Sequence, residues 1–456
     1  MENKIIEINS QKLENILQKV EKEFTYSKEI LEKIALTFQA EMKAGLAGKE
    51  SSLAMIPSYL AKPNLASSIN VPNEYLALDF GGTNLRLMKV NLEGNNKEKV
   101  IEFNESSPIA PAVINSSSSN VLFEFIAQKI KEFLAKPENK YVLEHKEVPM
   151  GYTFSFPYEQ TAESKGFLLK WAKGFKGKDA IGKDMVEVLE KAMQKEGIQN
   201  IRIKAIINDT TGTLLAGQHL QKCDTGMILG TGSNICVNLP VSYIQKKINP
   251  YTHDKMIIVM ECGNFDIRKA GVHTVYDEIL DNETDNKGHH LAEKILSGKY
   301  LGSILRVMLR DAVDNLEDNH LLNKFETIET KTISEIETIN IDKDTINAIF
   351  EKNNIGIKVV SDEDAQIIQK LCAHILIRSA HLTAAELTAT IKYIDPELKQ
   401  KHTVAMDGTV YKKAYLFKEK VASAFALLGA QNISIEEVED GSGIGAVIAA
   451  ASTYIS

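Results

Sequence analysis

The stretch YLALDFGGTNLRLMKV at 75–90 decides the fold class of this chain. Two apolar runs of β-forming residues flank a turn of two glycines, and this pattern predicts a hairpin. The stretch GMILGTGSNICVNL at 226–239 repeats the order strand, glycine turn, strand, and its Gly232 stands 150 residues after Gly82. Two glycine turns that each follow an apolar strand predict a duplicated unit whose backbone N–H groups and hydroxyls clasp phosphate.

Strand-like and helix-like segments alternate outward from these turns. Apolar β-forming runs predict two more strands, at 148–156 and within IRIKAIIND at 201–209. Apolar residues at helical spacing predict one or two helices within 2–45, and further helices at 121–134, 184–196 and 365–392. This alternation predicts an α/β protein.

The composition is typical of a soluble globular protein. Of the 456 residues, 44% are hydrophobic and 25% are charged, and the net charge is −8. This negative charge argues against a nucleic-acid partner, because domains that bind a nucleic-acid backbone are basic. No apolar run approaches the roughly 18 residues of a membrane span, and the N-terminal MENKIIEINS lacks the apolar core of a signal peptide. We therefore expect a cytoplasmic protein without a membrane partner.

Three other site signatures are rejected. The four cysteines show no CxxC spacing, so they predict reduced thiols rather than a metal site or disulfide framework. A GxxxxGK pattern ends at Lys183, but Asp184 follows where a magnesium-binding loop needs a hydroxyl. A GxGxxA pattern at 441–446 has too little chain after it for a dinucleotide-binding unit. The glycine turns are better explained as the walls of one nucleotide cleft.

Ten motifs, met in family order along nearly the whole chain, resemble those of the hexokinase family. They are MIPSYL (55–60), LDFGGTNLRL (78–87), GYTFSFPYEQ (151–160), WAKGFKG (171–177), NDTTGTLLAG (208–217), LGTGSNICV (229–237), ECGNF (261–265), GHHLAEKILSGKYLGSILR (288–306), AMDGTVYKK (405–413) and DGSGIGA (440–446). Such a set, in which TFSFP is followed downstream by NDTxGT, is specific to that family.

The resemblance implies a two-lobed actin-like ATPase fold, also called ribonuclease H-like, with a cleft between a small and a large lobe. It places 1–70 as the helical start of the large lobe, 71–207 in the small lobe, 208–440 in the large lobe, and 441–456 as a helix that returns to the small lobe. It implies ATP-dependent phosphorylation of a hexose at its 6-hydroxyl, the first step of glycolysis. D-glucose is the leading substrate, fructose and mannose are alternatives, and we expect a monomer or a homodimer.

The resemblance also implies two sets of site residues. The sugar set is Ser155, Phe156, Pro157, Lys173, Asn208, Asp209, Asn234, Glu261, His290 and Glu293. The nucleotide set is Asp79, Gly81, Gly82, Thr83, Asn84, Arg86, Thr231, Gly232, Gly408, Thr409, Gly441 and Ser442. Asp209 resembles the catalytic base, with Lys173 as the second catalytic residue. No direct metal ligand is implied, and Asp79 is expected to reach the Mg²⁺ of ATP through water.

These residue types suit that chemistry without the family. A carboxylate such as Asp209 can accept the proton of a sugar hydroxyl, and Lys173 can balance charge on a migrating phosphoryl group. Taken alone, however, Asp209 fits a helix N-cap equally well. Glu261 and Glu293, taken alone, fit solvated surface carboxylates better.

Four positions depart from the family pattern. Ala172 stands at the family's threonine, Cys262 at its tryptophan, His290 at its glutamine and Ile444 at its lysine. These changes bear on how tightly the sugar is bound and on which sugar is bound. They also suggest an alternative function, a noncatalytic sugar sensor or scaffold on the same fold. The neighbouring His289 and His290 do not predict a metal site, because adjacent residues do not share a helix face.

Overall fold

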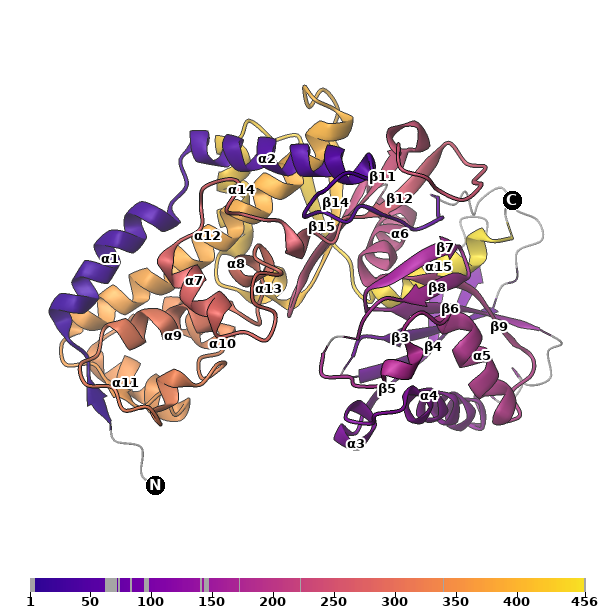
Figure 1. Ribbon diagram of the computed structural model, residues 1–456, viewed down its shortest axis with the longest axis horizontal. Coiled ribbons are helices and arrows are strands. Elements are labelled where there is room, and N and C mark those ends of the chain that lie inside the picture. The colour runs from indigo at the N-terminus through magenta and orange to yellow at the C-terminus, as the bar shows by residue number, and fades with distance from the viewer. Residues whose placement is uncertain are drawn as a thin grey trace.

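Two lobes, each built on one β-sheet, make up the chain (Figure 1). The computed structural model describes residues 5–61, 72, 74–82, 84–93, 98–139, 142, 147–171, 173–221, 223–338 and 340–454. The predicted α/β class is confirmed, and the predicted helices appear with ends shifted by a few residues. Thr83 and Ala172 lie outside the described residues.

The small lobe contains a five-stranded sheet of order β5-β4-β3-β6-β9. The predicted hairpin is confirmed, because β3 and β4 are antiparallel and Asp79 lies opposite Arg86. Strands β3, β6 and β9 are parallel, so their carboxyl ends meet at one edge of the sheet. The elements are β3 (Glu74–Phe80), β4 (Asn84–Glu93), β5 (Glu98–Pro108), α3 (Pro111–Ile114), α4 (Ser119–Leu134), β6 (Val148–Phe154), β7 (Tyr158–Ala162), β8 (Lys165–Leu168), α5 (Met185–Lys195) and β9 (Ile201–Ile207).

The large lobe contains a six-stranded sheet of order β15-β14-β10-β11-β12-β2. Strands β10 and β11 are antiparallel around the second glycine turn, and β14 runs parallel to β10, with Asp407 paired to Ile228. The strands are β2 (Ile56–Pro57), β10 (Thr225–Leu229), β11 (Ser233–Pro240), β12 (Lys255–Val259), β14 (His402–Asp407) and β15 (Ile433–Glu437), and a separate pair joins β1 (Ile6–Glu7) to β13 (Ile357–Lys358). The carboxyl ends of β10 and β14 therefore lie side by side at the second turn.

A 33-residue helix, α12 (Asp362–Ile394), is the axis of the large lobe. It begins at the N-cap Ser361, whose hydroxyl accepts the Asp364 N–H at 3.1 Å, and its second half is buried on all sides. A helix without a polar face belongs in a core, and α1, α2 and α14 pack on it. The other helices of this lobe are α1 (Ser10–Phe24), α2 (Lys28–Leu46), α6 (Asp209–Gln221), α7 (Val275–Asn282), α8 (Glu293–Leu296), α9 (Leu301–Asp311), α10 (Thr330–Thr338), α11 (Lys343–Lys352), α13 (Thr409–Lys413) and α14 (Phe417–Leu427).

Helices α6 and α15 (Gly441–Ser452) form the layer between the two sheets. α6 packs on β10, β11 and β14 of the large lobe, whereas α15 packs on β3, β6 and β9 of the small lobe. The two helices approach closely, because a Cβ added at Gly445 would lie only 2.1 Å from the Gly212 carbonyl oxygen. A Cβ added at Gly151 of β6 would lie 1.9 Å from the Ala446 oxygen. Glycine at these two positions therefore allows α15 to pack this closely against α6 and β6.

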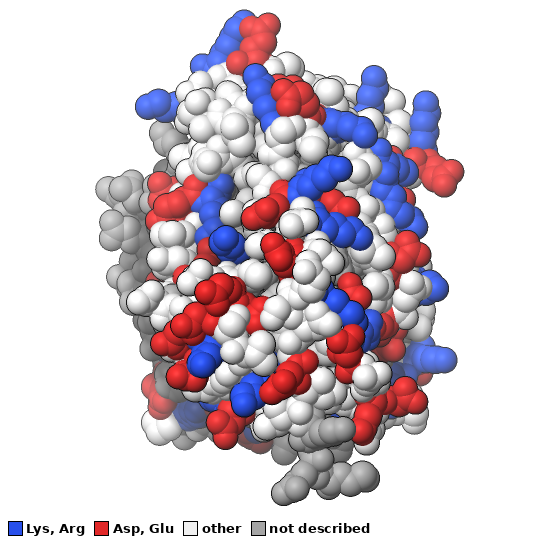
Figure 2. All heavy atoms as spheres, turned by 90° about the vertical axis from the view of Figure 1, so that its left-hand side faces the viewer, with Lys and Arg blue, Asp and Glu red and all other residues white. Residues whose placement is uncertain are grey.

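The charged surface of the large lobe is mixed. Figure 2 shows Lys and Arg side chains interspersed with Asp and Glu side chains over the described part of the face it presents. Exposed pairs such as Lys12 and Asp314, 2.7 Å apart, contribute about 0–1 kcal/mol each. Within the described ranges, no helix combines the length and the apolar character needed to traverse a bilayer.

Candidate active site

Asn208 and Asp209 lie where β9 ends and α6 begins, at the junction of the two sheets. The Thr210 N–H donates to Asn208 Oδ1 at 2.9 Å and to Asp209 Oδ1 at 2.8 Å, and the Thr210 hydroxyl donates to Asn208 Oδ1 at 2.5 Å. Asn208 and Asp209 therefore both accept from the start of α6, so helix capping does not by itself explain why an aspartate stands at position 209.

Asp209 is surrounded by groups from both lobes. Burial raises the pKa of its carboxyl, while the Lys173 ammonium, the Thr210 N–H and the Ser155 hydroxyl lower it and the Asp407 charge raises it further. Ser155 and Lys173 belong to the small lobe, whereas Asp407 ends β14 in the large lobe. A carboxyl with a raised pKa at such a junction is a candidate general base.

Lys173 joins the two small-lobe loops of the site. Its ammonium donates to the Gly81 carbonyl at 2.5 Å and to the Ser155 carbonyl at 3.0 Å, and it lies 5.1 Å from the centre of the Phe156 ring. Desolvation lowers the pKa of this ammonium, although the Asp209 and Asp79 charges raise it. One side chain thus joins the first glycine turn, at Gly81, to the loop that carries Ser155 and Phe156.

Glu261 and Glu293 are partly buried and anchored at the second glycine turn. Asn234 Nδ2 donates to Glu261 Oε1 at 2.9 Å, and the Ser233 N–H donates to Glu293 Oε2 at 3.0 Å. Burial and the neighbouring carboxylates raise the pKa of Glu261 to about 7, and burial also raises the pKa of Glu293. The interpretation of both as solvated surface carboxylates is therefore wrong. The anchoring contacts come from residues 233 and 234, which sequence spacing does not relate to them.

His290 stands beside Glu293, with its Nδ1 atom 3.6 Å from Glu293 Oε1. Burial and nearby lysines lower the pKa of this imidazole to about 4, so it is neutral at physiological pH. A neutral imidazole has one N–H donor and one acceptor nitrogen. It can therefore exchange hydrogen bonds with a polyol, as the glutamine amide of the family pattern would.

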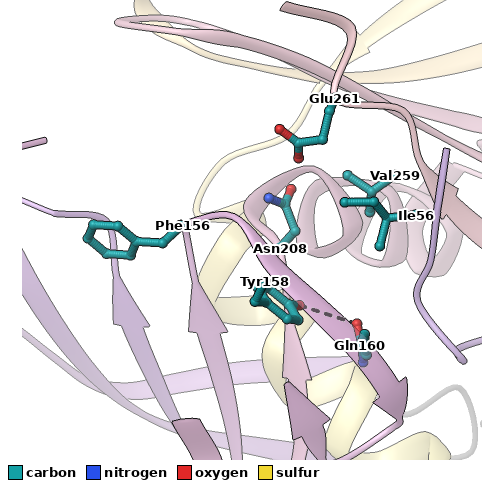
Figure 3. Close-up of a pocket in the computed structure, with 7 residues that line it drawn as sticks. All are labelled: Ile56, Phe156, Tyr158, Gln160, Asn208, Val259 and Glu261. Carbon is teal, nitrogen blue, oxygen red and sulfur yellow. Dashed lines mark hydrogen bonds between the residues drawn. The ribbon is translucent and has the colours of Figure 1, made fainter. Parts of the chain in front are cut away.

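A small, partly open pocket lies between the lobes at this point (Figure 3). The small lobe contributes Phe156, Tyr158 and Gln160, and the large lobe contributes Ile56, Asn208, Val259 and Glu261. In Figure 3, Asn208 and Glu261 face the same space, while Tyr158 donates to Gln160 Oε1 at 3.2 Å. Two predicted sugar ligands from different elements therefore share one pocket.

Backbone contacts hold the second glycine turn rigidly. The Gly298 N–H donates to the Gly230 oxygen at 2.7 Å, and the Lys299 N–H donates to the Thr231 oxygen at 3.2 Å. Gly408, at the carboxyl end of β14, has φ +124°, and a Cβ there would lie 2.3 Å from the Leu229 oxygen. Three chain segments thus meet without side chains between them, as a close approach of backbone to phosphate requires.

The remaining nucleotide candidates lie where the chain crosses to α15. Arg86 Nη2 donates to Asp440 Oδ1 at 2.6 Å, and the Thr153 hydroxyl donates to the Ser442 carbonyl at 2.8 Å. Burial raises the pKa of Asp79 to about 6, helped by the charges of Asp209 and Asp407 and opposed by those of Arg86 and Lys173. This set of facing carboxylates fits a hydrated Mg²⁺ carried by a nucleotide.

The structure brings most of the predicted site residues to this junction and adds others. Phe156 lines the pocket, but its ring packs against Phe80 and Phe175, with centroids 5.0 and 5.4 Å away. Residues missed from the sequence include Tyr158, Gln160, Ile56, Val259 and Asp407. Tyr158, Gln160 and Asp407 stand inside motifs quoted above, so their position was a usable signal.

Comparison with known proteins agrees with this geometry. Two family profiles described as hexokinase match residues 16–219 and 224–452. The Hexokinase-7 protein of Oryza sativa subsp. japonica is 34% identical over 92% of this chain and 93% of its own length. The Hexokinase-1 protein of Spinacia oleracea is 35% identical over 92% of this chain and 87% of its own.

A solved structure extends the likeness to three dimensions. The hexokinase of Schistosoma mansoni complexed with glucose matches with a TM-score of 0.84 and 27% identity, over 97% of this chain and 99% of that one. This chain therefore shares that hexokinase's fold, and its own two sheets form the two lobes expected of the actin-like kinases. On these sequence and structural grounds, the chain belongs to the hexokinase family of phosphotransferases.

Proposed function

We propose that this chain transfers the γ-phosphoryl group of ATP to the 6-hydroxyl of a hexose, with Asp209 as the catalytic base. The observation that carries the proposal is the grouping of Asp209, Asn208 and Glu261 beside a pocket, with Lys173 acting on Asp209 from the opposite lobe. A polyol ligand, a base and a cation are what phosphoryl transfer to a sugar requires.

Asp209 takes the proton of the attacking hydroxyl. Its raised pKa makes it a stronger base than a solvent-exposed aspartate, and the Lys173 charge opposes that rise by favouring the ionised form. Lys173, released from the Gly81 carbonyl, offsets negative charge as the phosphoryl group moves. Mg²⁺, when bound with ATP, supplies further positive charge, and Asp79 is the residue that we expect to hold its waters.

The sugar is oriented by side chains of the large lobe. Glu261 and Glu293 can each accept from two hydroxyls, and Asn208 and His290 can both donate and accept. The Schistosoma mansoni hexokinase was solved complexed with glucose, which supports D-glucose as the first hexose to test, before fructose and mannose. Phosphorylation of glucose would place the protein at the first step of glycolysis, in the cytoplasm, as a monomer or a homodimer.

We also propose that the lobes close on the sugar. The expected boundaries near 207 and 440 would be hinges, and the second carries the Arg86–Asp440 pair. The third expected boundary, near 70, lies outside the described residues. Closure excludes water, which would otherwise accept the phosphoryl group, and it assembles Ser155 and Lys173 against Asp209. Small-angle scattering that detects no compaction with saturating sugar would count against this step.

The experiment is a hexose panel with ATP and Mg²⁺, read as sugar-dependent ADP release. Turnover with at least one hexose, lost in Asp209→Asn, supports the proposal. Tight glucose binding in calorimetry without turnover would instead support the noncatalytic sensor suggested by the four sequence departures. An absence of both binding and turnover contradicts both functions.

A further inference from the structure

A carboxyl group with no assigned role lies behind the sugar pocket. Glu386 in α12 is 0% exposed, and among the described residues neither of its carboxyl oxygens has a hydrogen-bond partner. An ionised carboxylate buried without a partner is very costly, so burial raises the pKa of Glu386 well above its usual range. Burial therefore favours the neutral, protonated form of Glu386.

Glu386 lies against the segment that carries Glu261. The Cys262 thiol, also 0% exposed, is the side chain that interacts with Glu386. One turn later on α12, the Thr390 hydroxyl contacts Met260 Sδ at 3.8 Å. Residues four apart share a helix face, so one face of α12 meets the residues on both sides of Glu261.

The backbone at Glu261 needs such support. Its φ is +56°, in the left-handed region, which costs a non-glycine residue about 1–2 kcal/mol. A strained conformation persists only where the surroundings determine it. On the strand side, the Met260 N–H donates to the Ile235 oxygen at 2.9 Å, and on the loop side the Phe265 N–H donates to the Cys262 oxygen at 2.8 Å. The remaining side of the turn faces α12.

We propose that Glu386 is a positioning residue whose neutral carboxyl, seated under Cys262, holds the 260–262 turn and so aims Glu261 at the sugar. The proposal rests on the proposed function, which makes Glu261 a sugar ligand. At position 262 the family pattern has tryptophan, so the smaller Cys262 leaves room behind the turn for a side chain from α12. Glu386 replaces that missing bulk with a group that can also hydrogen-bond.

The test compares Glu386→Gln, Glu386→Ala and the control Leu376→Ala. Leu376 is equally buried in α12 but lies ten residues earlier, about 15 Å along the helix. We expect Glu386→Ala to raise the KM for the sugar about tenfold with the KM for ATP unchanged, because only the aim of Glu261 is lost. Glu386→Gln keeps shape and neutrality and should stay within about twofold of wild type. Leu376→Ala should lower stability and leave the sugar KM unchanged.

Three results would overturn the proposal: an unchanged sugar KM in Glu386→Ala, an equal rise in Leu376→Ala, or a loss in Glu386→Gln as large as in Glu386→Ala. If Glu386→Ala does not fold, Cys262→Ala provides the second measurement. It should raise the sugar KM, because the contact behind the turn is then lost from the other side. A folded Cys262→Ala variant with an unchanged sugar KM would contradict the proposal.

The same variants separate this inference from the proposed function. The chain has a single tryptophan, Trp171, two residues before Lys173. Its fluorescence, together with calorimetry, can therefore report sugar binding without turnover. If wild type binds but does not phosphorylate a hexose, the proposed function fails while the dissociation constants still test Glu386. If wild type phosphorylates a hexose and Glu386→Ala matches it, only the inference fails.

Discussion

The Gly81–Gly82 turn of the small lobe rests on the Lys173 side chain, whereas the Gly230–Gly232 turn of the large lobe is bound by backbone N–H groups of two other residues. At Gly82 an added Cβ would lie 2.4 Å from Lys173 Cδ, a flexible neighbour. At Gly230 the nearest groups are the backbone atoms of Gly408, 3.4 Å away. Similar sequence patterns thus give one turn that can move with a side chain and one that cannot.

The difference suits the two lobes to different tasks. The large-lobe turn connects directly to the proposed sugar ligands, because Ser233 and Asn234 bind Glu293 and Glu261. It can act as a fixed platform for sugar and nucleotide together. The small-lobe turn is tied to a lysine that must leave the Gly81 carbonyl before it can meet a phosphoryl group. It is the part expected to rearrange on closure.

The largest expected effect comes from replacing Asp209, the proposed catalytic base. Asp209→Asn should lower kcat by about 10²–10⁴, because the amide cannot accept the proton. Sugar binding, followed by Trp171 fluorescence, should remain measurable. Glu163→Gln is the matched control, since Glu163 is a half-buried small-lobe carboxyl with a raised pKa that lines neither turn. A variant that keeps more than half the wild-type kcat would contradict the role of Asp209.

The contrast between the turns is tested by alanine in place of glycine. Gly408→Ala meets backbone at a φ that disfavours any side chain, so it should lower the free energy of unfolding by about 1–3 kcal/mol or more. Gly82→Ala carries a similar backbone penalty, since Gly82 has φ +117°, but its Cβ meets only the lysine stem rather than backbone. It should therefore cost less stability than Gly408→Ala and lower kcat by displacing Lys173. Chemical denaturation measures the first effect and steady-state kinetics the second.

Gly81→Ala is the stability control for this pair, because a Cβ there meets no atom within 4 Å. Its free energy of unfolding should match that of wild type. Equal destabilisation by Gly82→Ala and Gly408→Ala would remove the distinction between a movable and a fixed turn.

The two sides of the cleft should also titrate separately. The pKa of Glu261, at the large-lobe turn, is about 7, and that of Asp79, before the small-lobe turn, is about 6. Only the ionised forms can accept two hydroxyls or hold hydrated Mg²⁺. The sugar KM should therefore rise as the pH falls through about 7, and the KM for ATP with Mg²⁺ as it falls through about 6, each by about tenfold per further unit. A common midpoint for both constants would contradict the assignment.

The smallest expected effect concerns Ala172, whose placement lies outside the described residues and which precedes Lys173 in sequence. Ala172→Thr restores a hydroxyl of the family pattern, and one neutral hydrogen bond is worth about 0.5–1.5 kcal/mol. The sugar KM should fall about two- to tenfold with kcat and the KM for ATP unchanged. A folded variant with an unchanged or higher sugar KM would mean that the pocket is built around alanine.

Much of the fold could be predicted because it follows from local sequence patterns. Both hairpins, the α/β alternation and the buried helix α12 follow from periodicity and glycine position. Strand β2 is different, since the two residues Ile56–Pro57 have no period and pair with β12 across some 200 residues of chain. Its place depends on long-range packing that no local window contains.

The sequence predicted which residues belong to the candidate site better than it predicted the surroundings of those residues. Asp209, Lys173 and Glu261 were found by motif, yet the burial that raises the pKa of Glu261 arises only when α12, β11 and the 261–265 segment meet. Glu386 shows the same limit. Helical periodicity predicts that α12 is buried. It does not predict that the acidic residue Glu386 is buried with the rest of the helix, because its contact with Cys262 is visible only in the structure.

The central layer has a consequence for how the protein is made. The two lobe cores draw on residues that are complete once β15 has been synthesised, but the core between the sheets needs α15, which follows β15 in the sequence. Ala446, Ile448 and Ala450 of that helix are 0% exposed in the finished protein. Since domains generally fold as units during synthesis, each lobe can gather its own core on the ribosome while their shared face stays uncovered. The junction that holds the proposed site can therefore form only after α15 has been added.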